Sequence, residues 1–407
     1  MRFDVVNLGC RVNRVESDSI AAKLVDHAWV IDRVNPQVVV VNTCTVTGEA
    51  DKKTRKTVRR VLKDYPEATV LVTGCAAAMT PEVYRAMSDR VRLVGKAGVV
   101  EAALSLGDDS LHGHLPAQAV RFGEDFPTRV GIKIQDGCDN ACTYCIVHVA
   151  RGKSTSLDCE ECLSEAKRHY LAGAREIVLT GIDLGNYDFK GMRLEGLLAR
   201  LVDELPEARI RISSIEPPSI TDGIVDMIAR SEGRICRHLH LPLQSGSSKV
   251  LAEMDRLYDA RAFRDLVDTL YERIPRMSLS TDIIVGFPGE TEEDFQQTLD
   301  MVEYCRFSKV HIFRYSRRAG TPAAVREDQV PAEVVSDRAR RLRDLAAKVR
   351  RQEQQRRLGT SEGVLVEEDG QGTTESFFTV RFDQPVTRGA LLDCTLARLD
   401  ENGVFRV

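Results

Sequence analysis

The sequence lacks any long apolar run. Its 407 residues are enough for two or three domains. No stretch approaches the roughly 20 apolar residues that a membrane-spanning helix needs, so no membrane association is expected. The amino-terminal segment MRFDVVNLGC also lacks the layout of an export signal, because it enters an expected strand directly. With 43% hydrophobic and 29% charged residues, these absences favour a cytoplasmic globular protein.

An excess of charge of one sign is absent as well. The net charge of −4 does not by itself indicate nucleic-acid binding. The eleven cysteines are odd in number and clustered at short spacings, which is unlike a disulfide framework. In a chain without an export signal, this pattern favours metal or redox chemistry in a reducing compartment.

The most informative motif is a group of three cysteines with the spacing CxxxCxxC, formed by Cys138, Cys142 and Cys145 directly after an apolar strand. Structural zinc and iron–sulfur sites use four protein ligands. Three thiolates on a 4Fe–4S cluster would leave one iron open to another ligand. The alternatives are a zinc site with a distant fourth ligand, or buried structural thiols.

A second group of three is Cys10, Cys44 and Cys75, each of which follows a short apolar run. The runs are residues 3–8, 37–41 and 69–73, and the helical patterns after them are 15–27, 49–62 and 81–87. Continuous β-branched runs alternating with helices predict a parallel sheet buried on both faces. Because ligands of such sheets bind at the carboxyl ends of the strands, the three cysteines are expected to converge there. The alternative is three unrelated small residues at strand ends.

A strand–helix pattern repeats six times in the centre of the chain and predicts a partial (β/α)6 barrel. The expected strands are 131–135, 176–180, 209–213, 238–241, 278–285 and 309–313, and the expected helices include 160–172, 194–205, 221–230, 260–273 and 292–304. A linker is expected at 115–127, a long charged helix at 331–357, and short strands with turns from 363 onward. The predicted division is an α/β domain at 1–116, the barrel with its charged helix at 128–357, and a small β-barrel at 360–407 that needs a neighbour to pack against.

With both cysteine groups, the barrel and the terminal β module, nearly the whole chain resembles the radical S-adenosylmethionine (SAM) methylthiotransferases. The resemblance implies an amino-terminal methylthiotransferase domain with an auxiliary 4Fe–4S cluster, a radical barrel with a second cluster, and a carboxyl-terminal TRAM domain. The phrases NLGCRVNRVES, NTCTVTGEADKKTRK, VTGCAA and EIVLTGIDLGNY are similar to the branch that acts on N6-threonylcarbamoyladenosine beside the anticodon of tRNA. The isopentenyladenosine tRNA branch and the ribosomal-protein branch are the alternatives within the family.

What the resemblance implies about chemistry rests on the six cysteines. SAM would bind the cluster on Cys138, Cys142 and Cys145, and its cleavage would give a 5′-deoxyadenosyl radical that removes hydrogen from carbon two of adenine. Sulfur would come from the cluster on the other three cysteines, and a second SAM would supply the methyl group. The clusters carry this chemistry, so no protein side chain is assigned a catalytic role. An electron donor such as a flavodoxin or ferredoxin is the expected protein partner.

Loops after the third, fourth and fifth barrel strands are the expected SAM contacts, by analogy with the superfamily. Polar residues there would bind ribose and other polar atoms, and glycines would let the backbone approach adenine. The candidates are Ser213, Ser214, Glu216, Gln244, Gly286 and Gly289.

Four features depart from the family pattern or stay open. His148 and Val149 replace an expected Pro-Tyr pair, and Cys159 with Cys162 forms a CxxC that we interpret as structural or incidental rather than redox-active.

From Val364 onward the chain has four arginines against eight acidic residues, so its positive charge is low for a segment that binds RNA. Phosphate contacts would then come from two basic segments, although either could be an ordinary solvated helix face. These segments contain Lys52, Lys53, Arg55, Lys56, Arg59 and Arg60, and Arg338, Arg340, Arg341, Arg343, Lys348, Arg350 and Arg351.

A hypothesis from another functional class is a non-catalytic iron–sulfur sensor that binds RNA. It predicts RNA affinity that changes with cluster oxidation and no release of 5′-deoxyadenosine. The complete set of barrel loops argues against it.

Overall fold

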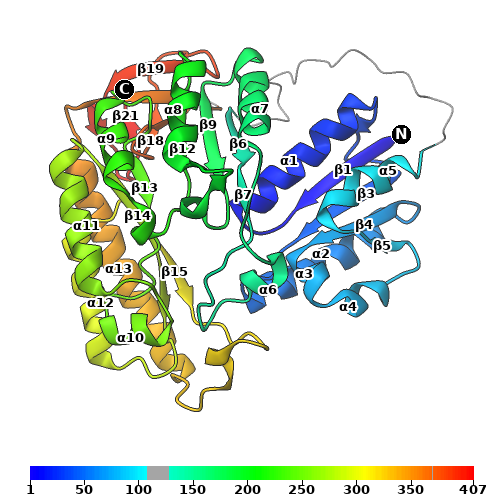
Figure 1. Ribbon diagram of the computed structural model, residues 1–407, viewed down its shortest axis with the longest axis horizontal. Coiled ribbons are helices and arrows are strands. Elements are labelled where there is room, and N and C mark those ends of the chain that lie inside the picture. Colours follow the sequence, from blue (N-terminus) through cyan, green and yellow to red (C-terminus); the bar gives the residue numbers. More distant parts are fainter. Residues whose placement is uncertain (108–127, 369) are drawn as a thin grey trace. The chain divides into compact units, whose positions relative to one another are not determined.

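A computed structural model describes residues 1–107, 128–368 and 370–407. The linker predicted at 115–127 therefore lies outside the described residues. The chain divides into two compact units, and each is described by itself. The first contains the amino-terminal residues together with 137–140 and 145–153, and the second contains the other described residues from 128 onward (Figure 1).

The first unit is a parallel five-stranded sheet with strand order β2-β1-β3-β4-β5. The predicted α/β sheet domain is therefore confirmed. Its strands are β1 (Arg2–Asn7), β2 (Val30–Ile31), β3 (Val38–Thr43), β4 (Thr69–Gly74) and β5 (Val91–Leu93). Its helices are α1 (Arg11–Asp26), α2 (Gly48–Asp64), α3 (Cys75–Met79), α4 (Pro81–Arg85), α5 (Val99–Leu104) and α6 (Val147–Arg151).

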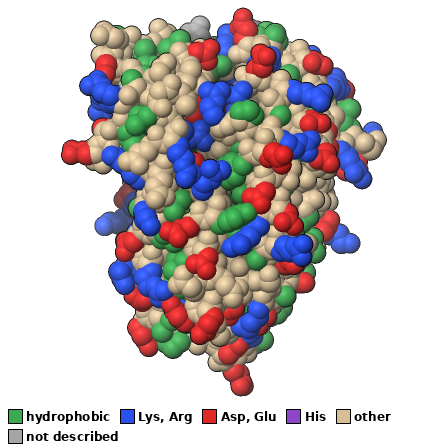
Figure 2. Space-filling model, turned by 90° about the vertical axis from the view of Figure 1, so that its left-hand side faces the viewer, with side chains coloured by type: hydrophobic (Ala, Val, Ile, Leu, Met, Phe, Trp, Pro, Cys, Tyr) green, Lys and Arg blue, Asp and Glu red, His purple; other side chains and the backbone are tan. Residues whose placement is uncertain are grey.

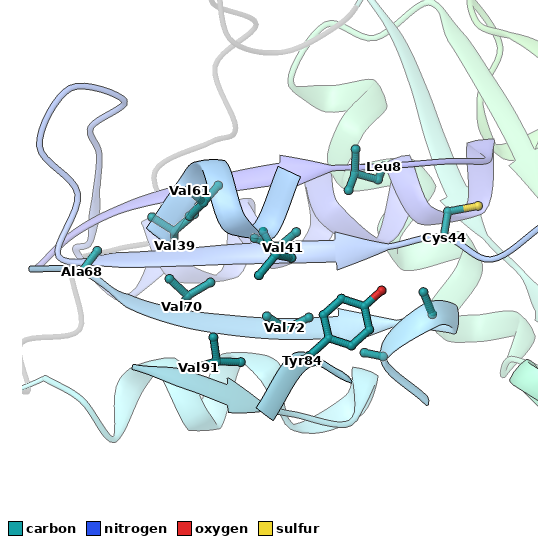
Figure 3. Packing of buried hydrophobic residues seen from close by; sticks show 13 residues of the cluster. Leu8, Val39, Val41, Cys44, Val61, Ala68, Val70, Val72, Tyr84 and Val91 are labelled. Atoms are coloured by element: carbon teal, nitrogen blue, oxygen red, sulfur yellow. The ribbon is translucent and has the colours of Figure 1, made fainter. Parts of the chain in front are cut away.

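Burial on both faces explains why the central strands read as continuous apolar runs. All six residues of β3 are buried, and alternate residues belong to different cores. Val39 and Val41 pack with Val70 and Val72 in one core, drawn in Figure 3, whereas Val38 and Val40 pack in the other. The sheet is therefore covered by an apolar core on each face.

The second unit contains six parallel barrel strands in sequential order. Sheets β12-β9-β6 and β13-β14-β15 are joined by single bridges between Ile210 and Ile235 and between Ser214 and His240. The strands are β6 (Arg129–Lys133), β9 (Glu176–Thr180), β12 (Arg209–Ile212), β13 (His238–His240), β14 (Ser278–Val285) and β15 (Lys309–Arg314). The predicted partial (β/α)6 barrel is therefore confirmed.

Seven helices and four short strands accompany the barrel strands in the described part of this unit. The helices are α7 (Cys159–Leu171), α8 (Leu194–Glu204), α9 (Asp222–Arg230), α10 (Ser248–Glu253), α11 (Ala260–Arg273), α12 (Glu292–Cys305) and α13 (Ala332–Arg356). The short strands are β7 (Gln135–Asp136), β8 (Thr155–Ser156), β10 (Asp188–Phe189) and β11 (Met192–Arg193). Figure 2 shows acidic and basic side chains interleaved over the face that carries α11, where Arg273 bonds to Asp222 and Asp226.

The terminal module is a mixed, curled sheet with strand order β19-β16-β17-β18-β21-β20. Its strands are β16 (Ser361–Val366), β17 (Gln371–Thr374), β18 (Thr379–Arg381), β19 (Leu391–Thr395), β20 (Arg398–Leu399) and β21 (Phe405–Arg406). Phe378, Val380, Leu396 and Phe405 are fully buried in its core. This small β domain agrees with the expected terminal module, and it belongs to the same compact unit as the barrel.

The module covers the amino ends of the barrel strands. The Arg209 guanidinium donates to the carbonyl oxygens of Gly363 at 2.6 Å and Thr373 at 2.9 Å, and Arg211 donates to those of Thr374 and Glu375. Both arginines bind the fully buried Glu176 carboxylate at 2.6 Å. A charged network therefore joins the first residues of β9 and β12 to the terminal module.

Among the described residues, no helix is long and apolar enough to cross a membrane.

Candidate functional site

In the first unit, the structure brings Cys10, Cys44 and Cys75 together at the carboxyl ends of three adjacent strands. Strand register pairs Asn7 with Asn42 and Asn42 with Thr73, so the three strands end at the same level. Cys10 precedes α1, Cys44 follows β3 by one residue, and Cys75 opens α3. Figure 3 shows Cys44 beyond the end of β3. The expected convergence is therefore present in the structure.

The environment of Cys44 confirms how close these groups are. Burial raises the pKa of the Cys44 thiol, and the neighbouring Cys10 and Cys75 thiols raise it further. A Cβ atom placed on Gly9 would lie 2.3 Å from the Cβ of Cys44, and φ of Gly9 is +101°. Only glycine fits there, because both the backbone conformation and the contact exclude a side chain.

Asn13 fixes the loops that carry two of these cysteines. Its side-chain nitrogen donates to the carbonyl oxygens of Leu8 and Thr43, both at 2.8 Å. Its side-chain oxygen lies 3.7 Å from the Cys10 sulfur. The Thr43 hydroxyl donates to the Thr73 carbonyl oxygen at 2.6 Å, which joins the end of β3 to that of β4. The cysteines therefore stand on loops that side-chain hydrogen bonds hold in place.

Helix α6, which begins two residues after Cys145, belongs to the same unit and packs against α3. Arg151 at its end is 1% exposed and binds both oxygens of the Glu16 carboxylate, at 3.1 and 3.3 Å. The same guanidinium donates to the side-chain oxygen of Asn13 at 2.6 Å. Asn13 therefore interacts with Cys10 on one side and with the helix that follows Cys145 on the other.

Turns fix the start of the CxxxCxxC segment in the first unit. The Cys138 amide donates to the Gly152 carbonyl oxygen at 3.2 Å. Gly137 has φ +73°, and a Cβ atom there would lie 2.0 Å from the Lys153 carbonyl oxygen. This close approach of two backbone segments requires glycine.

Cys142 belongs to the second unit, where Arg256 organises its surroundings. The Arg256 guanidinium lies 3.3 Å from the Cys142 sulfur and also donates to the Glu216 carboxylate and the Tyr258 hydroxyl. Burial raises the pKa of the Glu216 carboxyl, Arg256 acts in the opposite direction, and Asp183 and Asp282 raise it further. The guanidinium group of Arg256 therefore joins Cys142 to Glu216 and Tyr258.

The remaining SAM candidates lie on the second unit's loops. Ser213 follows β12, Ser214 bridges to His240 at the end of β13, and the Gln244 carbonyl oxygen accepts from the Ile284 amide. Gly286 and Gly289 both have φ +77°. A Cβ atom on Gly286 would lie 2.3 Å from Val335 of α13, and one on Gly289 would lie 2.5 Å from Arg326. Packing within the chain therefore already requires both glycines, a reason that differs from the expected approach to adenine.

Sequence reasoning missed several polar groups around these positions. Arg151 and Arg256 lie in no motif that the sequence analysis used, and Asn13 lies in the phrase NLGCRVNRVES but was given no role there. The roles of all three depend on contacts between distant segments. His240, Asp282 and His311 form another group, with ligand atoms within 4.8 Å of one another. They lie on β13, β14 and β15, and His240 approaches Asp282 at 3.3 Å. This group could hold a cation or a polar ligand.

The chemistry of the two cysteine groups fits iron–sulfur ligation. None of the eleven cysteines forms a disulfide. Thiolates are the protein ligands that iron–sulfur clusters use. Burial raises the pKa of Cys162 to about 12. The structural interpretation of the CxxC formed by Cys159 and Cys162 stays a prediction.

Two family models match the chain. Residues 132–302 match the radical SAM superfamily, and residues 2–95 match a family described as uncharacterized protein family UPF0004. A threonylcarbamoyladenosine tRNA methylthiotransferase, MtaB of Bacillus subtilis, is 41% identical over 82% of this chain and 78% of its own length. A tRNA-2-methylthio-N(6)-dimethylallyladenosine synthase of Corynebacterium jeikeium is 37% identical over 90% of this chain and 77% of its own.

Among solved structures, a radical SAM methyltransferase, TsrM of Kitasatospora setae, matches with a TM-score of 0.58. The match covers 80% of this chain and 77% of that protein at 15% identity. At this identity the likeness concerns the fold.

Proposed function

The chain belongs to the radical SAM methylthiotransferases, and on that premise we propose that it transfers a methylthio group to carbon two of N6-threonylcarbamoyladenosine in tRNA. The observation that carries the proposal is the convergence of Cys10, Cys44 and Cys75 at one sheet edge, in a chain that also contains the CxxxCxxC motif. The 41% identical Bacillus relative is named for this substrate. The enzyme uses two 4Fe–4S clusters and SAM.

We propose that Cys138, Cys142 and Cys145 hold one cluster and that Cys10, Cys44 and Cys75 hold the other. Bound to Cys138, Cys142 and Cys145, a cluster would supply the electron for reductive cleavage of SAM. The protein's own residues would hold the two clusters and SAM and would exclude water from them. Arg256 contacts the Cys142 sulfur, and the buried loops around Asn13 fix the other three cysteines.

SAM contacts are proposed at Ser213, Ser214, Glu216, Gln244, Gly286 and Gly289. Polar groups that are removed from water need hydrogen-bond partners, so the partly buried Glu216 and Ser214 would suit the ribose hydroxyls and the amino group of SAM. At the two glycines only backbone atoms are available to a ligand, because packing leaves no room for a side chain.

The proposal extends to partners and organisation. A flavodoxin or ferredoxin is the proposed electron donor, and the cytoplasm is the proposed location. The proposed domains are 1–116, 128–357 and 360–407. The module at 360–407 would act together with the barrel that it covers.

The test is mass spectrometry of nucleosides from digested tRNA of a strain without this gene, beside the parent. We expect methylthio-threonylcarbamoyladenosine to disappear and its unthiolated precursor to accumulate. Complementation with Cys10→Ala, Cys44→Ala or Cys75→Ala should restore no product, while the purified variants still release 5′-deoxyadenosine from SAM. A thiolated tRNA from any of these variants would show that the assigned roles of the cysteines are wrong.

A second candidate is the dimethylallyladenosine, or isopentenyladenosine, branch, which the 37% identical Corynebacterium relative favours. The same experiment separates the two, because only the isopentenyl nucleoside would then lose its methylthio group. If both nucleosides persist unchanged and no other enzyme of the cell makes them, a ribosomal-protein substrate or a non-catalytic RNA-binding sensor replaces the proposal. Release of 5′-deoxyadenosine distinguishes these last two.

A further inference from the structure

Helix α2 presents a basic stripe on the side opposite its buried face. Thr54, Thr57, Val58 and Val61 are buried against the sheet, with the spacing of one helical face. At 100° per residue, the opposite face carries a set of five exposed basic side chains. This basic stripe consists of Lys52, Lys56, Arg59, Arg60 and Lys63.

The length of the stripe matches an extended polyanion rather than a single small anion. Its residues span positions 52 to 63, which is about 16 Å at the helical rise. Acidic residues of α2 are confined to its ends, at Glu49, Asp51 and Asp64. The charges therefore run along the helix axis without acidic interruption.

Only one side chain of the basic stripe, that of Lys52, forms an ion pair with the described residues. Lys52 is 70% exposed and lies 3.0 Å from Glu49, whereas the other four make no ion pair or side-chain hydrogen bond with the described residues. Like charges at this spacing repel one another and destabilise a helix. The absence of local neutralisation points to a function outside the chain.

Helix α13, the other basic segment of the sequence, is different. Arg338 binds Glu290 at 2.8 Å while 5% exposed, Arg341 binds Glu292 at 2.5 Å, and Lys348 binds Glu303 at 3.2 Å. Arg350 and Arg351 donate to the backbone carbonyl oxygens of Ser308 and Asp400. These five side chains therefore hold α13 against neighbouring segments of the second unit, and Arg340 pairs within the helix with Asp337 and Asp344.

The terminal module offers little positive charge either. Arg398 and Arg406 both bind Asp383, and Arg388 binds Glu368. The module also covers the amino ends of the barrel strands, whereas the expected SAM loops follow the carboxyl ends. Phosphates near the reacting base need a different basic surface.

Helix α2 is joined directly to the Cys44 site. It begins four residues after Cys44, and the Thr54 hydroxyl donates to the Cys44 carbonyl oxygen at 3.2 Å. Val58 and Val61 pack in the same core as Cys44. A polyanion held along the basic stripe is thereby held by the same rigid unit that carries Cys10, Cys44 and Cys75.

We propose that the basic stripe of α2 is the surface that docks the phosphate backbone of the tRNA substrate. The inference rests on the proposed tRNA substrate and adds the surface that receives it. Binding there is electrostatic and independent of base sequence, so it positions the RNA while the barrel selects the nucleoside.

The experiment measures tRNA affinity of the full-length, cluster-loaded protein at several salt concentrations. The test variant carries Lys56→Gln, Arg59→Gln, Arg60→Gln and Lys63→Gln. The matched control removes four exposed charges elsewhere, by Arg230→Gln, Arg261→Gln, Arg340→Gln and Lys348→Gln. Circular dichroism and iron content check that both variants are folded and loaded.

The test variant should bind tRNA about tenfold or more weakly at physiological salt, and its log–log salt slope should be lower by about 3 to 4. The control should keep the parental slope within about one unit. Equal slopes for the test variant and the parent, or equal losses in both variants, would overturn the docking surface. A parent that binds and thiolates tRNA while the test variant is unaffected overturns this inference alone, whereas a parent that binds no tRNA overturns the proposed function with it.

Discussion

Single residues show how strongly the interior of this protein constrains ionisable groups. His169 of α7 is buried, and burial lowers its pKa to about 4, with Arg168 adding to the effect. In the unfolded chain the same imidazole has a pKa of about 6.5. Folding therefore keeps His169 neutral over a pH range in which the unfolded chain takes up a proton.

This difference predicts a specific acid sensitivity. Because the folded pKa is depressed, stability should fall as pH drops below about 6.5 and continue to fall toward pH 4. Between pH 7.5 and pH 5, the parent should lose about 2 kcal/mol more of its free energy of unfolding than His169→Gln. Urea denaturation at the two pH values measures this difference. Parallel losses in both proteins would show that His169 does not titrate in this way.

At the scale of secondary-structure elements, the position of helix α6 depends on side-chain contacts with a distant part of the chain. Helix α6 has only five residues, too few to be stable without tertiary contacts. The buried guanidinium of Arg151 ties it to Glu16 and Asn13 of α1. Lys96 also approaches Glu16, at 3.6 Å. The position of the helix after Cys145 is therefore set by a buried ion pair within the first unit.

A double-mutant cycle tests this coupling. Arg151→Met should lower the free energy of unfolding by about 3–5 kcal/mol, because it leaves the buried Glu16 carboxylate without its principal partner. Arg151→Met with Glu16→Leu should lose clearly less than the sum of the two single changes. Urea denaturation of the four proteins gives the coupling energy. Additive losses would mean that the two side chains act independently.

At a larger scale, the buried charges at the base of the barrel join the terminal module to the barrel strands within the second unit. Glu176 is fully buried, and Arg209 and Arg211 hold its pKa well below the usual range despite burial, which acts in the opposite direction. Arg129 lies 5.3 Å from the ring of Phe377 of the module, and His238 lies 4.9 Å from it. The module is thereby bound to the amino ends of β6, β9, β12 and β13.

Removing the shared carboxylate should loosen this junction. Glu176→Gln leaves two buried guanidinium groups without a counter-charge, and we expect a loss of about 3–5 kcal/mol in unfolding free energy. Protection of the backbone amides of residues 371–381 in hydrogen exchange should fall with it. The neighbouring surface change Glu207→Gln is the control, since the Glu207 side chain is 68% exposed and its pair with Arg175 contributes little. Unchanged protection in Glu176→Gln would contradict the role of the network.

The sequence predicted the parts of this architecture that rest on local pattern. Continuous valine runs such as residues 38–41 indicated buried parallel strands, and cysteines after three such runs indicated their convergence. Arg209 and Arg211 could not be interpreted in this way, because RIRI reads as a half-exposed strand although all four residues are buried. Their partners lie more than 150 residues away in the terminal module, a separation that no local pattern reports. The same limit applies to Asn13, Arg151 and the difference between α2 and α13.

The junction at the base of the barrel also has a consequence for biosynthesis. Arg209 donates a hydrogen bond to the carbonyl oxygen of Thr373, which is 164 residues later in the chain. At the usual pace of translation, the ribosome needs roughly 8 to 30 seconds to make that segment. During this interval Glu176 is already present to bind Arg209 and Arg211, but the carbonyl oxygens of the module are not. In a nascent chain that stops before residue 361, water or a chaperone has to replace those carbonyl oxygens, so early termination removes this support of the barrel along with the module.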